Sequence, residues 1–439
     1  MASTEEQVAH VWRRLGFGPS PSDMSYGLSI GPQALIEDLT NRALTGPGYW
    51  ALPAISGWDD PQPYMDRLFT LMQTSTNPLQ ERMAWMMMGL WVTAYADQND
   101  NTQMDNWVRS CRGNCLGTYS DLMSTVASGW PMQWYLNNVF SDKDHPNQNL
   151  ARELCELFTL GTTHPLTGAA NYSQTDVQEI ARALTGYDYD WDTEKAFWNP
   201  ANWDSGSKTI FGIDRGAAKL PDVLAAIKAH PSFGYYVPKR IYRELMGFDP
   251  SNQALQDMAP VWGPDGNLAA LVHHVATRPE FLSDEAIRCR VKSPMELVIG
   301  SLRVLGLTDI SRFYLEWQLN DMRQYPFQAP NVSGWPSGGA WLHAGMMVSW
   351  SALISWMCFE DDGTSATAKP DRCQTIRNLH HQGTNQTGGD LALTMVGLYD
   401  VSNETREALR DYAAAGPWEH WRACGLMQLA LSCPEYLLN

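Results

Sequence analysis

The chain has 439 residues, 18% of them charged, and a formal net charge of −17. A surface of this sign repels polyanions, so the composition argues against nucleic-acid binding and against attachment to acidic lipid, and leaves small molecules and neutral sugars as ligands. No run of about 18 apolar residues occurs, so we expect no membrane span.

The length is typical of two or three domains of about 100–200 residues, but no Gly- or Pro-rich linker divides the chain. We therefore predict one large helical domain over residues 1–439. The first residues, Met-Ala-Ser-Thr-Glu-Glu, lack the basic residues and apolar run of a secretory signal. This predicts a cytoplasmic protein, or an exported one whose leader has been removed.

Helix signals follow one another along the chain. A capping box at Ser3 precedes the first helix, Pro32 and Pro78 suit the first turns of the next ones, and Ser173 with Asp176 caps a helix that ends before Gly186. A helix is also expected over 147–161. Apolar periodicity predicts further helices over 220–230, 239–246, 268–277, 294–305, 311–323, 346–359, 391–399, 404–415 and 418–431.

Two segments break this pattern. Residues 187–213 are rich in Asp, Asn, Trp and Gly, and we expect a loop insertion there with at most a small β-hairpin. Residues 360–390 are predicted to be a second loop insertion. The fold class is thus mainly α, with long irregular loops.

Several segments carry a resemblance to a known family. They read Asn147-Gln-Asn-Leu-Ala-Arg-Glu-Leu-Cys-Glu-Leu-Phe-Thr-Leu-Gly161, Ala183-Leu-Thr-Gly-Tyr187 and Ala329-Pro-Asn-Val-Ser-Gly-Trp-Pro336, with support from 13–19, 291–300 and 432–436. Together they resemble the bacterial domain-of-unknown-function family DUF1800. The resemblance implies a helical fold from about residue 10 to the end and implies little about activity.

The chain departs from the family pattern at two places. Where the family has a Trp-His-Asn-His-Phe run, this sequence reads Trp85-Met-Met-Met-Gly-Leu-Trp91, and where the family has His-Asp it reads Trp203-Asp204. If the family uses those imidazoles for metal or acid–base chemistry, the resemblance implies that this chain has lost that chemistry.

The predicted helix over 147–161 carries one polar stripe on an otherwise apolar surface. At about 100° per residue, the stripe comprises Asn149, Arg152, Glu153 and Glu156. One interpretation is an ion pair between Arg152 and Glu156 that ties the helix to neighbouring loops. The functional interpretation makes Glu153 or Glu156 a general acid or base, with Arg152 and Asn149 binding substrate.

Two glutamates on one helix face point the same way, so they cannot enclose a sugar between them. A catalytic partner from another segment is more plausible, and Asp204 or Asp190 is our candidate, with Trp203 beside Asp204 as a substrate contact.

The second candidate is the loop 331–341. Its glycines and proline set an irregular backbone that displays Trp335 and Trp341, with His343 following. The loop is either a rigid turn that packs two indoles against the core or a stacking platform for a ligand. In the second interpretation Asn331 and His343 provide polar contacts.

Metal and cofactor signatures are weak. The chain lacks CxxC pairs and a Glu-x-x-His motif near the glutamates, so we expect no metal site and no cofactor. An oxygen-only Ca²⁺ site around 188–192 is an alternative to a solvated acidic loop. Two cysteine pairs, Cys111 with Cys115 and Cys358 with Cys373, lie in stretches that we interpret as loops and are candidates for disulfides.

Three functions remain open. The first is an enzyme that acts on a neutral substrate such as a glycan by carboxylate acid–base catalysis. The second is a non-catalytic binding or scaffold protein, which the missing histidines suggest. The third is a metal- or haem-dependent oxidoreductase, suggested by 20 Met and the many aromatic residues.

Overall fold

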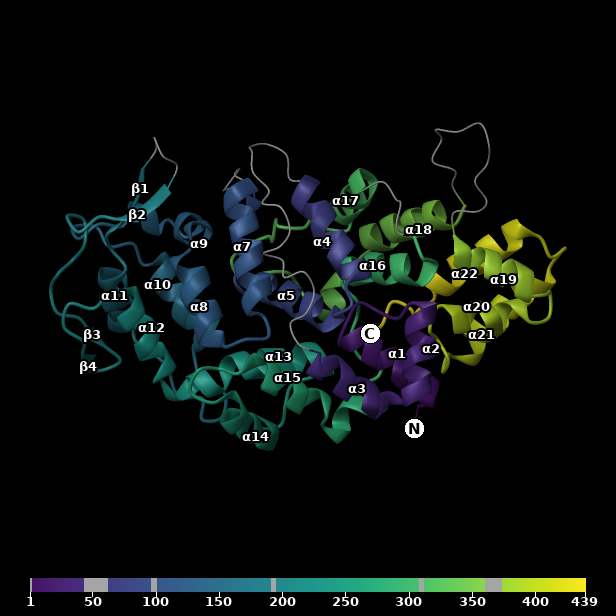
Figure 1. Cartoon of the computed structure of the whole chain (residues 1–439), viewed down its shortest axis with the longest axis horizontal. Helices are drawn as coiled ribbons and strands as arrows, with labels where there is room; N and C mark the ends of the chain where they lie inside the picture. The colour runs from purple at the N-terminus through teal and green to yellow at the C-terminus, as the bar shows by residue number, and fades with distance from the viewer. Residues whose placement is uncertain (1, 43–61, 96–100, 191–194, 308–311, 360–372) are drawn as a thin grey trace.

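A computed structural model describes residues 2–42, 62–95, 101–190, 195–307, 312–359 and 373–439. Within these ranges the chain is mainly helical, and its β structure comprises two small antiparallel sheets of two strands each. Figure 1 shows an elongated body in which the N-terminal helices lie near the middle and the last helices form one end. None of the described helices is both long and apolar enough to span a membrane.

The N-terminal helices begin where local capping dictates. Ser3 accepts a hydrogen bond from the N–H of Glu6, and Pro32 and Pro78 occupy first turns, as predicted. The predicted Ser3 capping box is incomplete, because the Glu6 carboxylate pairs with Arg13 instead. The helices of this part are α1 (Thr4–Arg14), α2 (Pro21–Ile30), α3 (Pro32–Asn41), α4 (Gln62–Thr74) and α5 (Pro78–Leu90).

Residues 101–282 form the end of the body that lies away from the last helices, and their later helices lie below α5 in the view of Figure 1. Ser173 and Asp176 exchange hydrogen bonds as the predicted capping box of α11. The helices are α7 (Asn101–Asn114), α8 (Tyr119–Ser128), α9 (Trp130–Tyr135), η2 (Asn138–Phe140), α10 (Asn149–Glu153), η3 (Leu154–Thr159), α11 (Gln174–Ala183), α12 (Leu220–Lys228), η4 (Pro231–Gly234), α13 (Tyr236–Met246), α14 (Asn252–Trp262), α15 (Leu268–Ala276) and η5 (Pro279–Leu282).

The insertion 187–213 holds the β structure. Strand β1 (Tyr187–Asp190) pairs antiparallel with β2 (Lys195–Trp198), with Tyr187 opposite Trp198. A second, shorter hairpin joins β3 (Thr209–Ile210) to β4 (Ile213–Asp214). The segment therefore contains two hairpins where we predicted at most one.

The C-terminal third is built around α16, whose 12 residues are all buried. Its residues are mostly apolar, its buried Glu296 and Arg303 are paired with charged partners, and the helix contacts α4, α17 and α19. The helices of this part are α16 (Pro294–Leu305), α17 (Arg312–Asp321), η6 (Gly338–Trp341), α18 (Ala344–Phe359), α19 (Gln374–Gln382), α20 (Gly388–Met395), α21 (Asn403–Ala414) and α22 (His420–Ser432).

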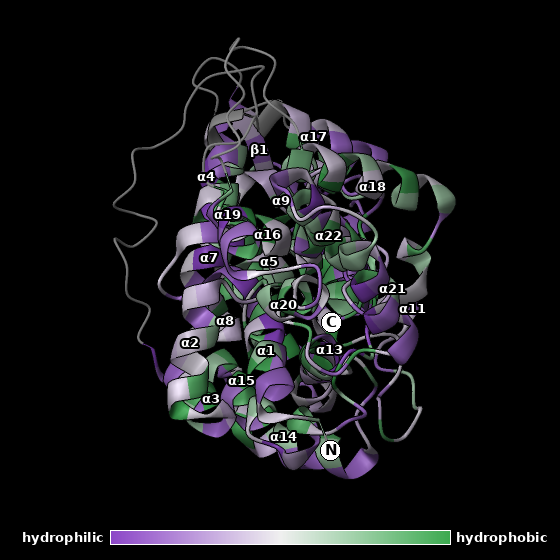
Figure 2. Cartoon of the chain, turned by 90° about the vertical axis from the view of Figure 1, so that its right-hand side faces the viewer, coloured by the Kyte–Doolittle hydropathy of each residue, from purple (hydrophilic) through white to green (hydrophobic). Residues whose placement is uncertain are grey.

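One hydrophobic core runs through the described residues, from Val8 of α1 to Leu437 beyond α22. Figure 2 shows green and purple residues alternating along single helices, as amphipathic helices packed on a shared core require. The N- and C-terminal parts meet in this core, since Arg14 donates to the backbone carbonyls of Ala286 and Asn439.

Three local predictions need correction. Helix α19 and the start of α20 lie within 360–390, where we predicted a loop, and residues 360–372 lie outside the described residues. Cys111 lies inside α7 and not in a loop. The predicted helix over 147–161 begins as α10 but continues as the π-helix η3, so its second half does not follow a rotation of 100° per residue.

Candidate ligand-binding cleft

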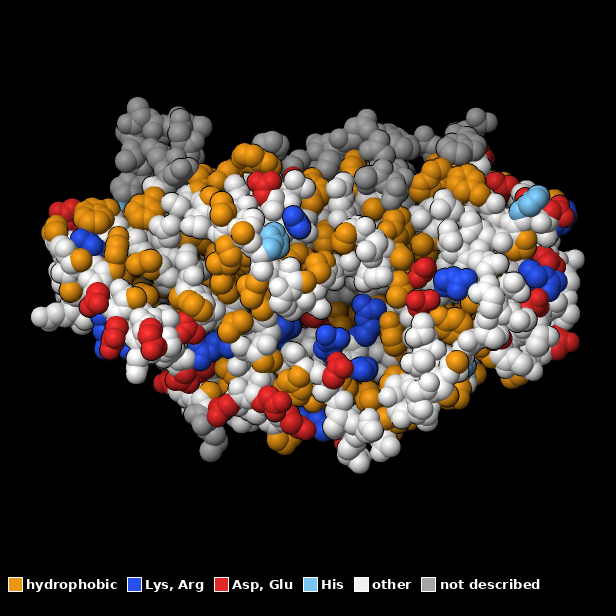
Figure 3. All heavy atoms as spheres, turned by 180° about the vertical axis from the view of Figure 1, so that it is seen from behind, with side chains coloured by type: hydrophobic (Ala, Val, Ile, Leu, Met, Phe, Trp, Pro, Cys, Tyr) orange, Lys and Arg blue, Asp and Glu red, His pale blue; other side chains and the backbone are white. Residues whose placement is uncertain are grey.

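A cleft of about 440 Å³ opens between α5, α13, the start of α16 and the loop 335–341. Its walls carry four arginines and two glutamates, together with Trp85, Trp335 and Trp341. The space-filling view in Figure 3 shows a hollow near the middle of the molecule with Lys and Arg side chains around it, in the region where α5 and α13 lie.

The loop 335–341 is held against α5 by a close backbone contact. Gly334 has a φ of +90°, and a Cβ at this position would lie 2.4 Å from the carbonyl oxygen of Gly89. A glycine is required here both for the left-handed backbone and for the approach. This contact brings Trp335 beside the C-terminal turn of α5.

Four buried or half-buried side chains form a closed ring of ion pairs on the cleft wall. Arg82 pairs with Glu296 at 2.6 Å and with Glu244 at 2.7 Å. Arg290 completes the ring, pairing with Glu244 at 3.2 Å and also with Glu296. Each carboxylate faces two guanidinium groups, so the ring is neutral and its members are already paired.

The ring keeps Glu296 ionised. Burial alone would raise the pKa of Glu296, but Arg290, Arg82 and the N–H of Ser293 outweigh it and hold the pKa far below its usual range. Burial alone would lower the pKa of Arg290, and the two glutamates reverse that shift and raise it. Neither group is placed to exchange protons near neutral pH.

Two further arginines of the cleft come from α13 and lie outside the ring. Arg240 donates through Nη1 to the carbonyl of Leu157 at 3.1 Å, which satisfies an open carbonyl near the end of η3. Its Nε and Nη2 have no hydrogen-bond partner among the described residues. Arg243 is 64% exposed and only loosely paired, with its Nε 3.7 Å from Asp249. The side chains that line the cleft therefore carry a net positive charge.

The polar stripe of the 147–161 segment does not form the ion pair between Arg152 and Glu156 that one interpretation predicted. Arg152 donates to the amide oxygens of Gln148 and Gln174, and no ion pair to Glu156 is found among the described residues. Glu156 instead accepts a hydrogen bond from the Tyr172 hydroxyl at 3.2 Å. The other two residues of the stripe differ in burial: Glu153 is half-buried, and Asn149 is exposed.

The titration of this segment is shifted by burial. Burial, with the neighbouring Glu156 carboxylate, raises the pKa of Glu153. Burial and the same carboxylate raise the pKa of Tyr172. A raised pKa is what a general acid needs, and Glu153 has one.

Asp204 lies in a separate cluster of ion pairs. Arg182 donates to it at 2.7 Å through Nε, and Lys208 lies 3.7 Å away. The hydrogen bonds from Arg182, aided by the charge of Lys208, lower the pKa of Asp204. Trp203 beside it stacks under the Lys208 and Lys219 ammonium groups. Between described residues no hydrogen bond or ion pair joins Asp204 to Glu153 or Glu156.

Of the predicted site residues around the loop 331–341, Asn331 and His343 bond to nearby backbone, and the two tryptophans line the cleft. Asn331 accepts a hydrogen bond from the N–H of Ser333 at the start of the loop. His343 accepts from the N–H of Met346 through Nδ1, which caps the first turn of α18. Trp335 and Trp341 both line the cleft, although Trp341 is only 3% exposed.

Comparison with known proteins identifies the family of the chain. The sequence pattern of a family described as a protein of unknown function (DUF1800) matches residues 10–438. The chain belongs to this family. A search of curated proteins finds no match, and a search of solved structures finds none.

In this DUF1800 protein, two of the segments that carried the resemblance, 291–300 and 329–336, meet at the cleft. The first supplies Ser293 and Glu296, and the second supplies Trp335 and Pro336. The segment 85–91 lines the cleft as well, through Trp85 and Met86. These stretches are far apart in the sequence. Their convergence makes the cleft the best candidate for the functional site.

The sequence analysis missed the arginines of the cleft. Arg82, Arg240, Arg243 and Arg290 lie on three separate segments, and no local motif links them. One signal was available: Arg240 and Arg243 are three residues apart on a predicted helix and so share a face.

The described residues contain no group of three or more His, Cys, Asp or Glu that is arranged to hold a metal ion. All eight cysteines are free thiols, including the candidate pairs Cys111 with Cys115 and Cys358 with Cys373. Asp188, in the segment considered for Ca²⁺, accepts from the side-chain amides of Asn199 and Asn202, and Asp192 lies outside the described residues.

Proposed function

We propose that the cleft binds a small organic anion, with the acidic group on Arg240 and Arg243 and a flat apolar part against Trp335. The observation that carries this proposal is the imbalance of charge: four arginines against two glutamates line the cleft of a chain whose net charge is −17. Arginine presents a planar set of donors that matches carboxylate, sulfate and phosphate.

The overall charge of the chain led us to expect a neutral ligand. Local charge decides in a cleft, because exposed charges more than about 10 Å away are screened by salt while nearby, partly desolvated charges are not. A cleft of about 440 Å³ also suits a small molecule and not a polymer.

Binding is a better match to the cleft than catalysis. The two carboxylates on its wall are each paired with two arginines, so neither is an unpaired group that could act on a substrate. This supports the second of the three functions considered above, a binding protein, over an enzyme acting on a neutral glycan.

The test compares anions with a neutral molecule of the same shape. We expect isothermal titration calorimetry at low salt to detect binding of at least one of benzoate, phenyl sulfate and phenyl phosphate. Benzamide, which keeps the ring and removes the charge, should bind about tenfold more weakly or not at all. Equal binding of benzamide, or no binding of any of the three anions, would contradict the proposal.

One observation favours a second candidate function, acid–base catalysis by Glu153. Its pKa is raised by burial and it lies one turn from the Glu156–Tyr172 hydrogen bond on a π-helix, a feature often found at functional sites. Because Asp204 is held by Arg182, this function needs another partner for Glu153. Turnover of neutral oligosaccharides that Glu153→Gln abolishes and Asp204→Asn preserves would establish it.

A further inference from the structure

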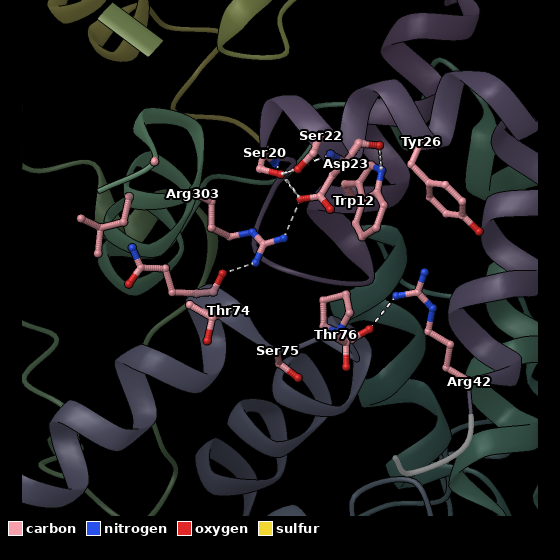
Figure 4. Close-up of a pocket in the computed structure, with 14 residues that line it drawn as sticks. Trp12, Ser20, Ser22, Asp23, Tyr26, Arg42, Thr74, Ser75, Thr76 and Arg303 are labelled. Atoms are coloured by element: carbon pink, nitrogen blue, oxygen red, sulfur yellow. Dashed lines mark hydrogen bonds and ion pairs between the residues drawn. The ribbon is translucent and has the colours of Figure 1, made fainter. Parts of the chain in front are cut away.

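A second pocket, of about 710 Å³, lies between the start of α2, the end of α4 and the end of α16. Figure 4 shows its side chains: Trp12 and Tyr26 lie on one side, Thr74, Ser75 and Thr76 on another, and the Arg303–Asp23 pair between them. Hydroxyl groups dominate the wall, since Ser20 and Ser22 line it too. The pocket shares no lining residue with the cleft.

The charges around this pocket cancel. Arg303 donates a hydrogen bond to Asp23 at 2.8 Å. Its other nitrogens donate to backbone carbonyls, including those of Gly18 and Gln73. Arg42 is paired with Asp38 at 2.5 Å and also donates to the carbonyl of Thr76. Each arginine of this pocket is thus paired with a carboxylate of its own, Arg303 with Asp23 and Arg42 with Asp38.

Some polar groups of the wall are open to a ligand. The hydrogen bonds of Asp23 all fall on Oδ2, and its Oδ1 has no partner among the described residues. The hydroxyls of Tyr26 and Thr76 likewise have no partner in the described part of the chain. These open groups, one anionic acceptor and two hydroxyls, recognise hydroxyl donors and acceptors.

Apolar faces stand beside these groups. The Trp12 ring lines the pocket with its Nε1 turned away, donating to the carbonyl of Asp23 at 3.0 Å. Pro78, Leu302 and Trp12 are themselves buried, so the Tyr26 ring, 41% exposed, is the apolar face that a ligand can reach. Sugars combine an apolar C–H face with a rim of hydroxyls, so a wall of this composition is complementary to them.

We infer that this pocket is a second binding site, separate from the cleft, for a neutral polyhydroxylated molecule of mono- or disaccharide size. The balanced charge disfavours ions, the open hydroxyls and Asp23 Oδ1 bind the ligand hydroxyls, and the exposed Tyr26 ring receives its apolar face. The two sites lie at opposite ends of α16, since Glu296 lines the cleft and Arg303 the pocket.

The experiment blocks the pocket and leaves the cleft intact. Ser22 is exposed at the start of α2 and lines the pocket, whereas Ser25 is exposed on the same helix and does not. Saturation-transfer NMR would test glucose, galactose, mannose, N-acetylglucosamine, maltose and cellobiose against wild type, Ser22→Trp and Ser25→Trp. We expect at least one sugar to bind wild type and Ser25→Trp and to lose its signal with Ser22→Trp.

Further variants keep the result interpretable. Tyr26 is 41% exposed, so Tyr26→Ala should fold even if Ser22→Trp does not, and it should also weaken the sugar signal. Arg240→Gln, in the cleft, should leave that signal unchanged, which separates this inference from the proposed function. Absence of binding by all six sugars, or binding that survives both Ser22→Trp and Tyr26→Ala, would overturn the inference.

Discussion

Gly334 packs directly on Gly89, and a Cβ at residue 334 would lie 2.4 Å from the Gly89 carbonyl oxygen. We expect Gly334→Ala to lower the free energy of unfolding by about 2–4 kcal/mol, because the side chain meets backbone that cannot yield and the φ of +90° strains any other residue. Urea denaturation measures this. Gly339→Ala is the control, since a Cβ there has nothing within 4 Å. Equal stability of the two variants would contradict the contact.

The ion-pair ring predicts a large cost for removing one member. Arg82 is 2% exposed and pairs with two carboxylates, so Arg82→Met should destabilise the fold by about 3–5 kcal/mol, the usual cost of leaving a buried charge uncompensated. Arg410→Met, which removes a half-exposed arginine paired with Asp390, should cost about 1 kcal/mol or less. Similar losses in the two variants would show that the ring adds nothing beyond surface pairing.

Lys292 gives the stability a pH dependence. Burial, aided by the positive charge of Arg13, lowers its pKa from 10.5 to about 7. Between these values the unfolded chain holds a proton that the folded protein has released, so this residue makes stability rise with pH above about 7.

Denaturation of wild type and Lys292→Met at pH 6.5, 7.5 and 8.5 isolates this contribution. The stability of the wild type relative to the variant should rise with pH, at a slope that approaches about 1.4 kcal/mol per pH unit. A constant difference across this range would mean that Lys292 keeps its charge in the fold. The window stays below the ordinary pKa of 9.0 of the cysteines, whose buried thiols titrate higher.

The sequence predicts those features that local contacts decide. The starts of α3, α5 and α11 follow from Pro32, Pro78 and the Ser173–Asp176 capping box, because each depends on residues within one turn. The loop 331–341 could be singled out because its glycines and indoles stand together. Its two tryptophans do line the cleft.

Features that depend on distant partners could not be predicted. The sequence offers Asp204 as a catalytic partner of Glu153 or Glu156, but in the fold Arg182 of α11 binds the Asp204 carboxylate. The ring of Arg82, Glu244, Arg290 and Glu296 joins three segments that share no pattern. The change from α-helix to π-helix at Leu154 adds a residue to a turn and leaves no trace in the apolar spacing.

The charge of Arg240 tests the central claim most directly. The measurement is the affinity of the best-bound anion among benzoate, phenyl sulfate and phenyl phosphate for wild type, Arg240→Gln, Arg240→Lys and the distant control Arg410→Gln. Arg240 is only half-buried, so the fold should survive its replacement by glutamine, while the lost charge should weaken binding about tenfold or more. Arg240→Lys should retain part of the affinity, and Arg410→Gln should retain all of it. Unchanged affinity in Arg240→Gln, or an equal loss in Arg410→Gln, would show that the anion does not bind in the cleft.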